Sequence, residues 1–309
     1  MLCGGTSSER AVSLKSGEKA LAALDPSRYD VTRYDPAHDL PRLVADAPSL
    51  DVALLVLHGP RGEDGTVQGL LDLLGVPYQG SGVLGSALAM NKQAAKILYQ
   101  AAGIPVPSYA ALTRKTPPDF DRIVEDVGLP LVVKPCQGGS SIGMSLVRAA
   151  DQLPAATALA LEQDTEALAE AYVSGTEITC GVLGNDDLMP LPLVEIVPEG
   201  GSSFFDYTAK YQVGGATEIC PARMDDKITA RAQALGVAAH RALFCRGYSR
   251  TDMIVSGNDI YVLETNTIPG MAQTSLLPLA AAAAGLPFSA LLDRLIELAL
   301  EDRRAAAKV

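Results

Sequence analysis

Two carboxylates and an amide in the last quarter of the chain have the residue types and spacing of a metal site. Glu264 and Asn266 lie two residues apart in the strand-like segment "YVLETN", so their side chains point to the same face. Asp252 lies in the strand-like segment "YSRTDMIV" and joins them if the two strands pair. Oxygen ligands of this kind suit Mg²⁺ or Mn²⁺, which often also bind substrate phosphates. From spacing alone, an ordinary polar strand face is the alternative interpretation.

Arg250 and His58 could act beside such a site. Arg250 precedes Asp252 by two positions and would face the same way, where its planar donors could hold a phosphate or an oxyanion. A salt bridge to a carboxylate is the alternative. His58 directly follows the apolar run 52–57, and open α/β sheets bind ligands at such strand ends. A structural histidine is the alternative. His240 lies in a predicted helix and is expected to be structural.

A glycine- and serine-rich segment, "KPCQGGSSIGMS", follows the apolar run that ends at Lys134. Glycine loses more conformational freedom on folding than other residues, so the cluster needs a reason. It could form a hairpin turn, or a loop whose backbone N–H groups lie over phosphate oxygens.

In the N-terminal segment "CGGTSSERAV", a helix is expected to begin near Glu9, with Ser7 or Ser8 as its cap. Glu9 is then stabilised by the helix dipole, or it binds a substrate ammonium.

Composition narrows the class of protein. The 309 residues are 48% hydrophobic, and this length indicates two or three domains. The net charge of −11 argues against a nucleic-acid partner. The five cysteines are scattered without a CxxC pair, which favours a reducing, cytoplasmic location. No uninterrupted apolar run of about 18 residues is present, so no membrane span is expected, and no signal peptide is visible.

The elements expected to position these side chains follow from the hydrophobic pattern. Alternating strands and helices in the first eighty or so residues predict a parallel α/β unit. The segment 198–218 lacks periodicity and predicts a lid. Helices are predicted at 66–74, 86–102, 225–244 and from 286 onward, and strands at 52–57, 75–78, 259–266 and on both sides of Ser174-Gly175. No P-loop, no G-x-G-x-x-G opening a βαβ unit and no G-x-S-x-G occurs, which disfavours three common enzyme classes.

Taken together, six segments in order resemble the D-alanine–D-alanine ligase family of the ATP-grasp superfamily. They are "GGTSSERAVSLKSG", "LHGPRGEDGTVQGLLDLLGVPYQGSGVLGSALAMNK", "LVVKPCQGGSSIGMS", "FFDYTAKY", "SRTDMIV" and "VLETNTIPGMAQTSLLP". The resemblance covers essentially the whole chain. It implies an α/β fold, in part α+β, with a parallel N-terminal domain (1–85) and two domains (86–172 and 173–309) that clamp ATP between antiparallel sheets. It also implies a homodimer that joins two D-alanines through a D-alanyl phosphate, for peptidoglycan precursor synthesis.

The same resemblance implies roles for individual residues by their position in the motifs. Glu9 would hold the ammonium of the first D-alanine, with Ser140 and Tyr211 as its partners in lid closure, and His58 would lie near its carboxylate. The oxyanion contacts would be Arg250 and Gly270, and Ser275 and Leu276 would bind the carboxylate of the second D-alanine. Lys210 is a further expected substrate contact, because a positive charge in the closed lid raises the fraction of the neutral attacking amine. Of the ATP contacts, Lys92 and Lys134 would bind the phosphates, which Ser141 would help to cover. Glu177 would contact the ribose, and the adenine hinge would include Glu170, Ala171 and Val173. The ligands of two Mg²⁺ or Mn²⁺ ions would be Asp252, Glu264 and Asn266.

Two departures from the family pattern lead to expectations of their own. Only Met1, Leu2 and Cys3 precede the first glycines, where the family has a full strand, so the native start is expected upstream or the first strand is lost or rebuilt. Ala171 stands where many members have a long polar side chain, so only backbone contacts to adenine are expected there.

Three alternatives remain open at this point. A D-alanyl-D-lactate ligase is disfavoured by Lys210 and Tyr211, because ligases that form this ester replace that lid segment. A different ATP-grasp carboxylate–amine ligase would use another acceptor. A non-catalytic nucleotide-binding regulator would not need the set of Arg250, Asp252, Glu264 and Asn266.

Overall fold

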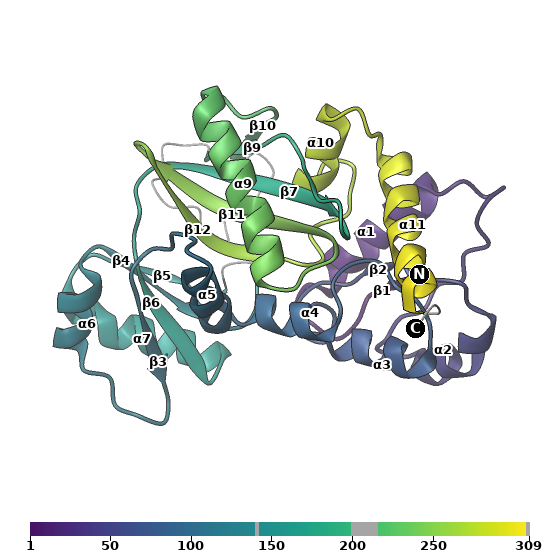
Figure 1. Cartoon of the computed structure of the whole chain (residues 1–309). Coiled ribbons are helices and arrows are strands. Elements are labelled where there is room, and N and C mark those ends of the chain that lie inside the picture. The colour runs from purple at the N-terminus through teal and green to yellow at the C-terminus, as the bar shows by residue number, and fades with distance from the viewer. Residues whose placement is uncertain (140–141, 199–215, 307–309) are drawn as a thin grey trace.

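The computed structural model describes residues 1–139, 142–198 and 216–306, with only the backbone for 302–306, and its strands form three sheets (Figure 1). The first sheet pairs β1 (Leu2–Cys3) and β2 (Leu55–Val56) in parallel. The second is antiparallel in the order β3 (Tyr109–Thr113), β6 (Glu166–Ala171), β4 (Leu131–Pro135), β5 (Ser145–Val147). The third is antiparallel in the order β10 (Ala216–Ile219), β9 (Val194–Pro198), β7 (Thr176–Gly184), β11 (Gly247–Ser256), β12 (Asp259–Asn266), and β8 (Met189–Pro190) pairs with β7.

The helices of the described residues cover these sheets and connect them. They are α1 (Arg10–Ala23), α2 (Leu40–Asp46), α3 (Thr66–Leu74), α4 (Val83–Met90), α5 (Lys92–Ala101), α6 (Phe120–Val127), α7 (Leu153–Gln163), α9 (Asp226–Ala242), α10 (Leu276–Ala283) and α11 (Phe288–Ala306).

The N-terminal sheet corrects two expectations from the sequence. The short segment before the first glycines is a strand in the structure: Leu2 N donates to Leu54 O at 2.8 Å and Cys3 N donates to Tyr34 O at 3.1 Å. The strand predicted over 52–57 is shorter in the structure, since only its last part pairs with β1. The strand predicted over 75–78 is reduced to one parallel bridge between Ala53 and Tyr78. Beyond it, the Gln79 side chain bonds both the N–H and the C=O of Leu55, at 2.7 and 2.6 Å.

The two antiparallel sheets each bury one face under helices and turn the other toward a common cavity. On the four-stranded sheet, Leu131, Val133 and Ala169 pack in a core with residues of α6 and α7. On the larger sheet, Cys180 and Met253 pack in a core with α9, which crosses that sheet in Figure 1. Since side chains alternate along a strand, residues between these core positions face the cavity.

The hairpin of β11 and β12 confirms the predicted pairing. Asp252 lies opposite Glu264, and Arg250 lies opposite Asn266. The register shifts between Asp252 and Met253, which partners Val262, so Leu263 is an additional residue in β12. Such bulges re-aim side chains. Here Leu263 and Glu264 both line the cavity, while Val262 remains in the core.

The single helix predicted over 86–102 is two helices in the structure. Asn91 has an extended backbone (φ −91°, ψ 102°) between α4 and α5, and its side chain accepts a hydrogen bond from Ala94 N at 2.9 Å. This is an N-cap, which satisfies an otherwise unpaired helical N–H group. The break places Lys92 at the first position of α5, where its N–H donates to Cys136 O at 2.9 Å.

The remaining helix predictions are confirmed with small shifts of their ends. The α3 helix has the predicted bounds, and α9 begins after Asp225, whose side chain accepts from Lys227 N and Ile228 N at 2.9 Å.

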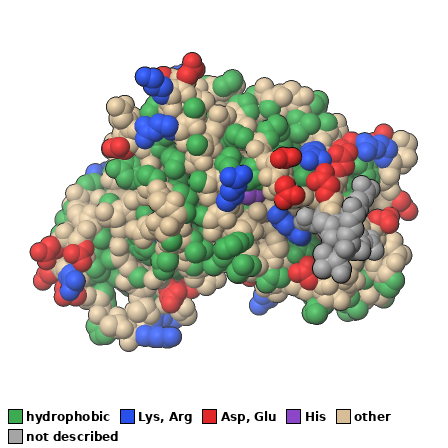
Figure 2. All heavy atoms as spheres, viewed as in Figure 1, with side chains coloured by type: hydrophobic (Ala, Val, Ile, Leu, Met, Phe, Trp, Pro, Cys, Tyr) green, Lys and Arg blue, Asp and Glu red, His purple; other side chains and the backbone are tan. Residues whose placement is uncertain are grey.

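Among the described residues no single helix is long and apolar enough to cross a membrane. Only the pair of α10 and α11, which are bent by 102° relative to each other, reaches that length and composition. On the face shown in Figure 2, acidic and basic side chains lie interspersed among hydrophobic ones.

Candidate functional site

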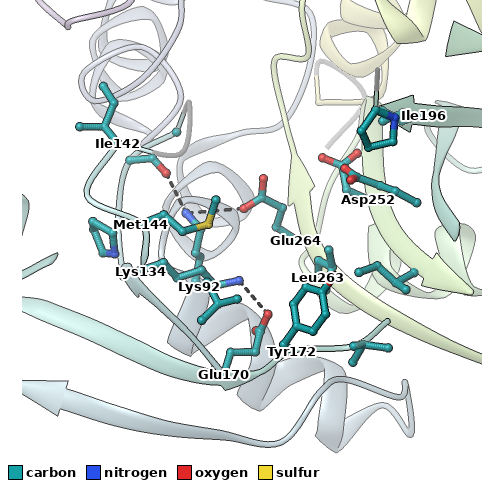
Figure 3. A pocket seen from close by; sticks show the side chains of 18 of the residues that line it. Lys92, Lys134, Ile142, Met144, Glu170, Tyr172, Ile196, Asp252, Leu263 and Glu264 are labelled. Carbon is teal, nitrogen blue, oxygen red and sulfur yellow. Dashed lines mark hydrogen bonds and ion pairs between the residues drawn. The ribbon is translucent and has the colours of Figure 1, made fainter. Parts of the chain in front are cut away.

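Two adjoining cavities lie where the three sheets meet. The larger, of about 700 Å³, is lined by strands of both antiparallel sheets, and Figure 3 shows side chains that line it. The smaller, of about 330 Å³, also receives residues from the N-terminal part and from the start of α10. Glu9, Lys92, Asp252 and Glu264 line both cavities, so the two cavities adjoin at these side chains.

The larger cavity gathers the predicted nucleotide contacts that lie in the described residues. They are Lys92, Lys134, Glu170, Ala171, Val173 and Glu177. The Lys134 ammonium donates to Glu170 Oε1 at 2.9 Å (Figure 3). Burial lowers the pKa of Lys134, but the charges of Glu170 and Glu264 and the hydrogen bond to Glu170 together raise it by more, so this lysine stays cationic.

Lys92 connects the two sheets across the larger cavity. Its Nζ donates to Gly138 O at 2.7 Å and lies 3.6 Å from Glu264 Oε2 (Figure 3). One end of this contact is in the glycine-rich segment, and the other is a predicted metal ligand. The arrangement brings a positive charge to the place where a phosphate chain would meet a metal ion.

The three predicted metal ligands lie together on the cavity side of the β11–β12 hairpin. Asn266 Nδ2 donates to Asp252 Oδ2 at 3.1 Å, and Asp252 lies opposite Glu264. The described residues contain no group of three or more His, Cys, Asp or Glu side chains that could hold a metal, so this set supplies two carboxylates and one amide oxygen. That donor set fits Mg²⁺, which binds through one or two carboxylates and takes its other ligands from phosphates and water.

Arg250 makes the salt bridge that the sequence left open as the alternative interpretation. Its Nε and Nη2 donate to the two oxygens of Asp252, each at 2.8 Å. Burial lowers the pKa of Arg250, but Asp252 raises it by more, so the guanidinium stays charged. Arg250 also lines the smaller cavity.

The smaller cavity gathers the predicted amino-acid contacts that lie in the described residues. They are Glu9, His58, Arg250, Gly270, Ser275 and Leu276. Ser275 Oγ accepts a hydrogen bond from Ala272 N at 3.2 Å, and Ser275 is the residue before α10. A Cβ on Gly270 would lie 3.0 Å from Ser275 Oγ, so the backbone comes close to this hydroxyl.

Glu9 lies between two glycines. A Cβ on Gly59 would lie 2.9 Å from Glu9 Oε2, and a Cβ on Gly139 would lie 3.3 Å from the same oxygen. Gly59 also has a φ of +74°, which disfavours other residues. Ser7 Oγ donates to His58 O at 2.6 Å and ties the loop before α1 to the end of β2. The predicted ammonium-binding carboxylate is therefore held where the N-terminal part meets the glycine-rich segment.

His58 is 7% exposed and contacts a residue that the sequence reasoning missed. Its Nδ1 lies 3.5 Å from Glu63 Oε1, which also accepts from Gly59 N at 2.9 Å. Burial lowers the pKa of His58, but the hydrogen bond and charge of Glu63 raise it by more, and Glu9 adds to this. A backbone hydrogen bond to Ile268 raises the pKa of His58 as well, and the imidazole lines the smaller cavity.

Four predicted residues lie outside the described part of the chain: Ser140, Ser141, Lys210 and Tyr211. His240 is structural, as predicted: its Nδ1 lies 2.7 Å from Ser249 Oγ, and burial lowers its pKa to about 4.

Besides Glu63, the sequence did not predict a role for Lys96, which lies one helical turn beyond Lys92 and contacts Glu170. That spacing of four residues was the available signal, because it puts both lysines on one helix face.

Comparisons with known proteins agree with this geometry. A family model described as the D-ala D-ala ligase C-terminus matches residues 98–297, and one described as the D-ala D-ala ligase N-terminus matches residues 38–81. The chain is 63% identical to a D-alanine–D-alanine ligase of Syntrophobacter fumaroxidans, over 98% of this chain and 97% of that protein. It is 53% identical to a D-alanine–D-alanine ligase of Desulfotalea psychrophila, over 97% of this chain and 94% of that protein.

Solved structures show the same likeness. The D-alanine–D-alanine ligase of Bacillus anthracis complexed with ATP matches with a TM-score of 0.87 at 36% identity, over 99% of this chain and 98% of that one. The VanG D-Ala:D-Ser ligase of Enterococcus faecalis matches with a TM-score of 0.82 at 32% identity, over 96% of this chain and 98% of that one.

Proposed function

The chain belongs to the D-alanine–D-alanine ligase family, and from this premise we propose that it joins two D-alanines with ATP, releasing ADP and phosphate. One observation carries the proposal most directly. A nucleotide-sized cavity and an amino-acid-sized cavity adjoin at Lys92, Asp252 and Glu264, where a γ-phosphate could meet a carboxylate. The division into 1–85, 86–172 and 173–309 is part of the proposal, supported by the succession of the three sheets along the chain.

We assign ATP to the larger cavity. Lys92 and Lys134 offset the charge of its phosphates, and Glu177 lies on the cavity face for the ribose. Asp252, Glu264 and Asn266 would hold divalent cations, which neutralise phosphate charge when bound. Metal ligation of Asp252 requires its oxygens to be shared with Arg250 or released by it, because Arg250 bonds both of them in this structure.

We assign both amino acids to the smaller cavity. Glu9 would bind the ammonium of the first D-alanine. The guanidinium of Arg250 and the imidazole of His58, whose pKa is raised, would attract carboxylate oxygens. Ser275 and Leu276 would bind the carboxylate of the second D-alanine, where the N-terminal end of α10 carries a partial positive charge.

The reaction takes two steps. An oxygen of the first carboxylate attacks the γ-phosphorus, the bond to ADP breaks, and D-alanyl phosphate forms. The neutral amine of the second D-alanine then attacks the acyl carbon, and phosphate leaves with the oxygen that attacked. The second ammonium has to lose its proton to react, since free amino acids are mostly ammonium at neutral pH. Arg250 is placed to stabilise the oxyanion of this second step.

The test is product analysis with ATP and Mg²⁺ in parallel reactions. We expect dipeptide and phosphate with D-alanine, neither with L-alanine, and little ester when D-lactate competes with D-alanine near neutral pH. Because a D-Ala:D-Ser ligase shares the fold, D-serine is a required further acceptor. Binding of ATP without phosphate release would favour the non-catalytic regulator, and D-alanyl-D-lactate as the main product would favour the ester-forming ligase.

A further inference from the structure

A cluster of three buried charges lies at the wall of the larger cavity. Glu170 forms ion pairs with two lysines: Lys96 Nζ contacts its Oε2, and Lys134 Nζ lies 2.9 Å from its Oε1. The exposed fractions of the residues are 0% for Lys96, 4% for Glu170 and 8% for Lys134. Fully buried lysines are rare in proteins, so Lys96 needs a physical reason.

The fold builds this cluster from three elements. Lys96 lies one turn after Lys92 on α5. Lys134 on β4 pairs with Leu168, and Glu170 on β6 pairs with Val132, so Lys134 and Glu170 share the cavity face as diagonal neighbours. Tyr109 on β3 lies opposite Glu170, and its ring centroid is 5.6 Å from Lys96 Nζ. The Lys96 ammonium therefore lies within reach of both an aromatic ring and a carboxylate.

Lys96 differs from the other two members in its access to a ligand. Lys134 and Glu170 line the larger cavity, whereas Lys96 lines neither cavity. Burial raises the pKa of Glu170, but the charges of Lys134 and Lys96 lower it by more, so the carboxylate is ionised. Burial lowers the pKa of Lys96, and the charge of Glu170 opposes this shift. The two lysine side chains share one carboxylate, because Lys96 Nζ and Lys134 Nζ each contact a different oxygen of Glu170.

We propose that Lys96 is a positioning residue for the nucleotide phosphates: it takes up the charge of Glu170, which leaves the charge of Lys134 for the phosphate chain. A phosphate that binds Lys134 has to draw it from Glu170. If Glu170 had no other partner, a buried carboxylate would then be left unpaired, which is costly. With Lys96 in place, Glu170 keeps an ion pair while Lys134 turns to the ligand. The inference rests on the proposed function only in assigning a nucleotide to the larger cavity.

The test compares ADP with adenosine in calorimetric titrations of the whole chain with Mg²⁺ present. In Lys96→Met, Glu170 holds Lys134 alone, so we expect the Kd for ADP to rise about tenfold, within the range of coupling between neighbouring charges. The Kd for adenosine, which lacks phosphates, should change less than about twofold, because it does not use the charge of Lys134. A general loosening of the cavity would weaken both ligands and would contradict the proposal.

A second variant keeps the test decisive if Lys96→Met does not fold. In Glu170→Gln there is no carboxylate charge for Lys96 to take up. The double variant Lys96→Met/Glu170→Gln should therefore fold and bind ADP as Glu170→Gln does, within about threefold, since the coupling has been removed. ADP binding by the double variant that is weaker than that of Glu170→Gln by about tenfold or more would overturn the inference.

The outcomes for the inference and for the proposed function are distinct. If the wild-type chain binds ADP and Lys96→Met binds it equally well, the role of Lys96 is wrong while the nucleotide assignment stands. If the wild-type chain binds neither ADP nor ATP, the proposed function is wrong, and the inference falls with it. Lys115→Met on an exposed surface is the matched control, and it should change neither Kd.

Discussion

Asp252 and Glu264 lie directly opposite each other on β11 and β12, with both side chains at the junction of the two cavities. Two carboxylates in this position repel each other and any phosphate that approaches, unless a cation lies between them. This pair therefore makes the metal assignment testable.

Glu264→Gln should lower phosphate release with D-alanine at least about 100-fold, comparable to the loss of one preorganised transition-state contact. ATP binding should persist but weaken, because Lys92 and Lys134 remain. The measurement is phosphate release over a Mg²⁺ titration. Asp259→Asn makes the same chemical change at an exposed position of the hairpin and should be neutral. Near-normal release by Glu264→Gln at saturating Mg²⁺ would refute the assignment.

Gly59→Ala tests the placement of Glu9. Its Cβ would lie 2.9 Å from Glu9 Oε2, and a φ of +74° adds backbone strain of about 1–2 kcal/mol. We expect the KM for D-alanine to rise about tenfold, since small misplacements in a site have large kinetic effects. Gly103→Ala has a similar φ of +72° with nothing within 4 Å, so it should lose similar stability without a change in KM. Equal KM values in the two variants would contradict the role of Glu9.

Asn91→Ala tests the break between α4 and α5. Loss of the cap should lower the free energy of unfolding by about 1 kcal/mol and weaken ATP binding, because the cap fixes the start of α5 at Lys92. Asp119→Ala removes an equivalent cap from α6, where the side chain accepts from Arg122 N at 3.1 Å. That control should lose similar stability in denaturant titrations and bind ATP normally. If both variants bind ATP normally, the break does not position Lys92.

Glu63→Gln tests the charge of His58. The folded pKa of His58 is raised above its usual value, so the pair contributes stability that is fully present below about pH 6.5 and lost as the pH rises through the folded pKa. The Tm difference between wild type and Glu63→Gln should therefore be larger near pH 6 than near pH 9. The exposed Glu162→Gln should show no such trend. A Tm difference that is constant or grows with pH would contradict a cationic His58.

The hairpin of β11 and β12 could be predicted from sequence because alternation along a strand is a local property. Glu264 and Asn266 share a face at any strand position, and the turn between the two strands leaves few possible registers. The helices at 66–74 and 226–242 were predictable for the same reason, since their caps and periodicity are local.

What could not be predicted depends on contacts between distant segments. The helical pattern of 86–102 continues through Asn91, and only the contact of Lys92 N with Cys136 O shows why the helix breaks there. The burial of Lys96 depends on Glu170 and Tyr109, which lie on strands far along the chain. Met1 to Cys3 gave too short a run to indicate a strand, and the hydrogen bonds to Leu54 and Tyr34 come from partners that the sequence does not pair.

The central claim is that a D-alanine carboxylate is phosphorylated by ATP at the junction of the two cavities. The most direct measurement uses D-alanine with oxygen-18 in its carboxylate and follows the mass of the released phosphate. Because the attacking carboxylate oxygen leaves with the phosphorus, one labelled oxygen should appear in each phosphate that accompanies dipeptide, and none in ADP. Dipeptide formed with unlabelled phosphate, or with the label in a nucleotide, would contradict the D-alanyl phosphate route.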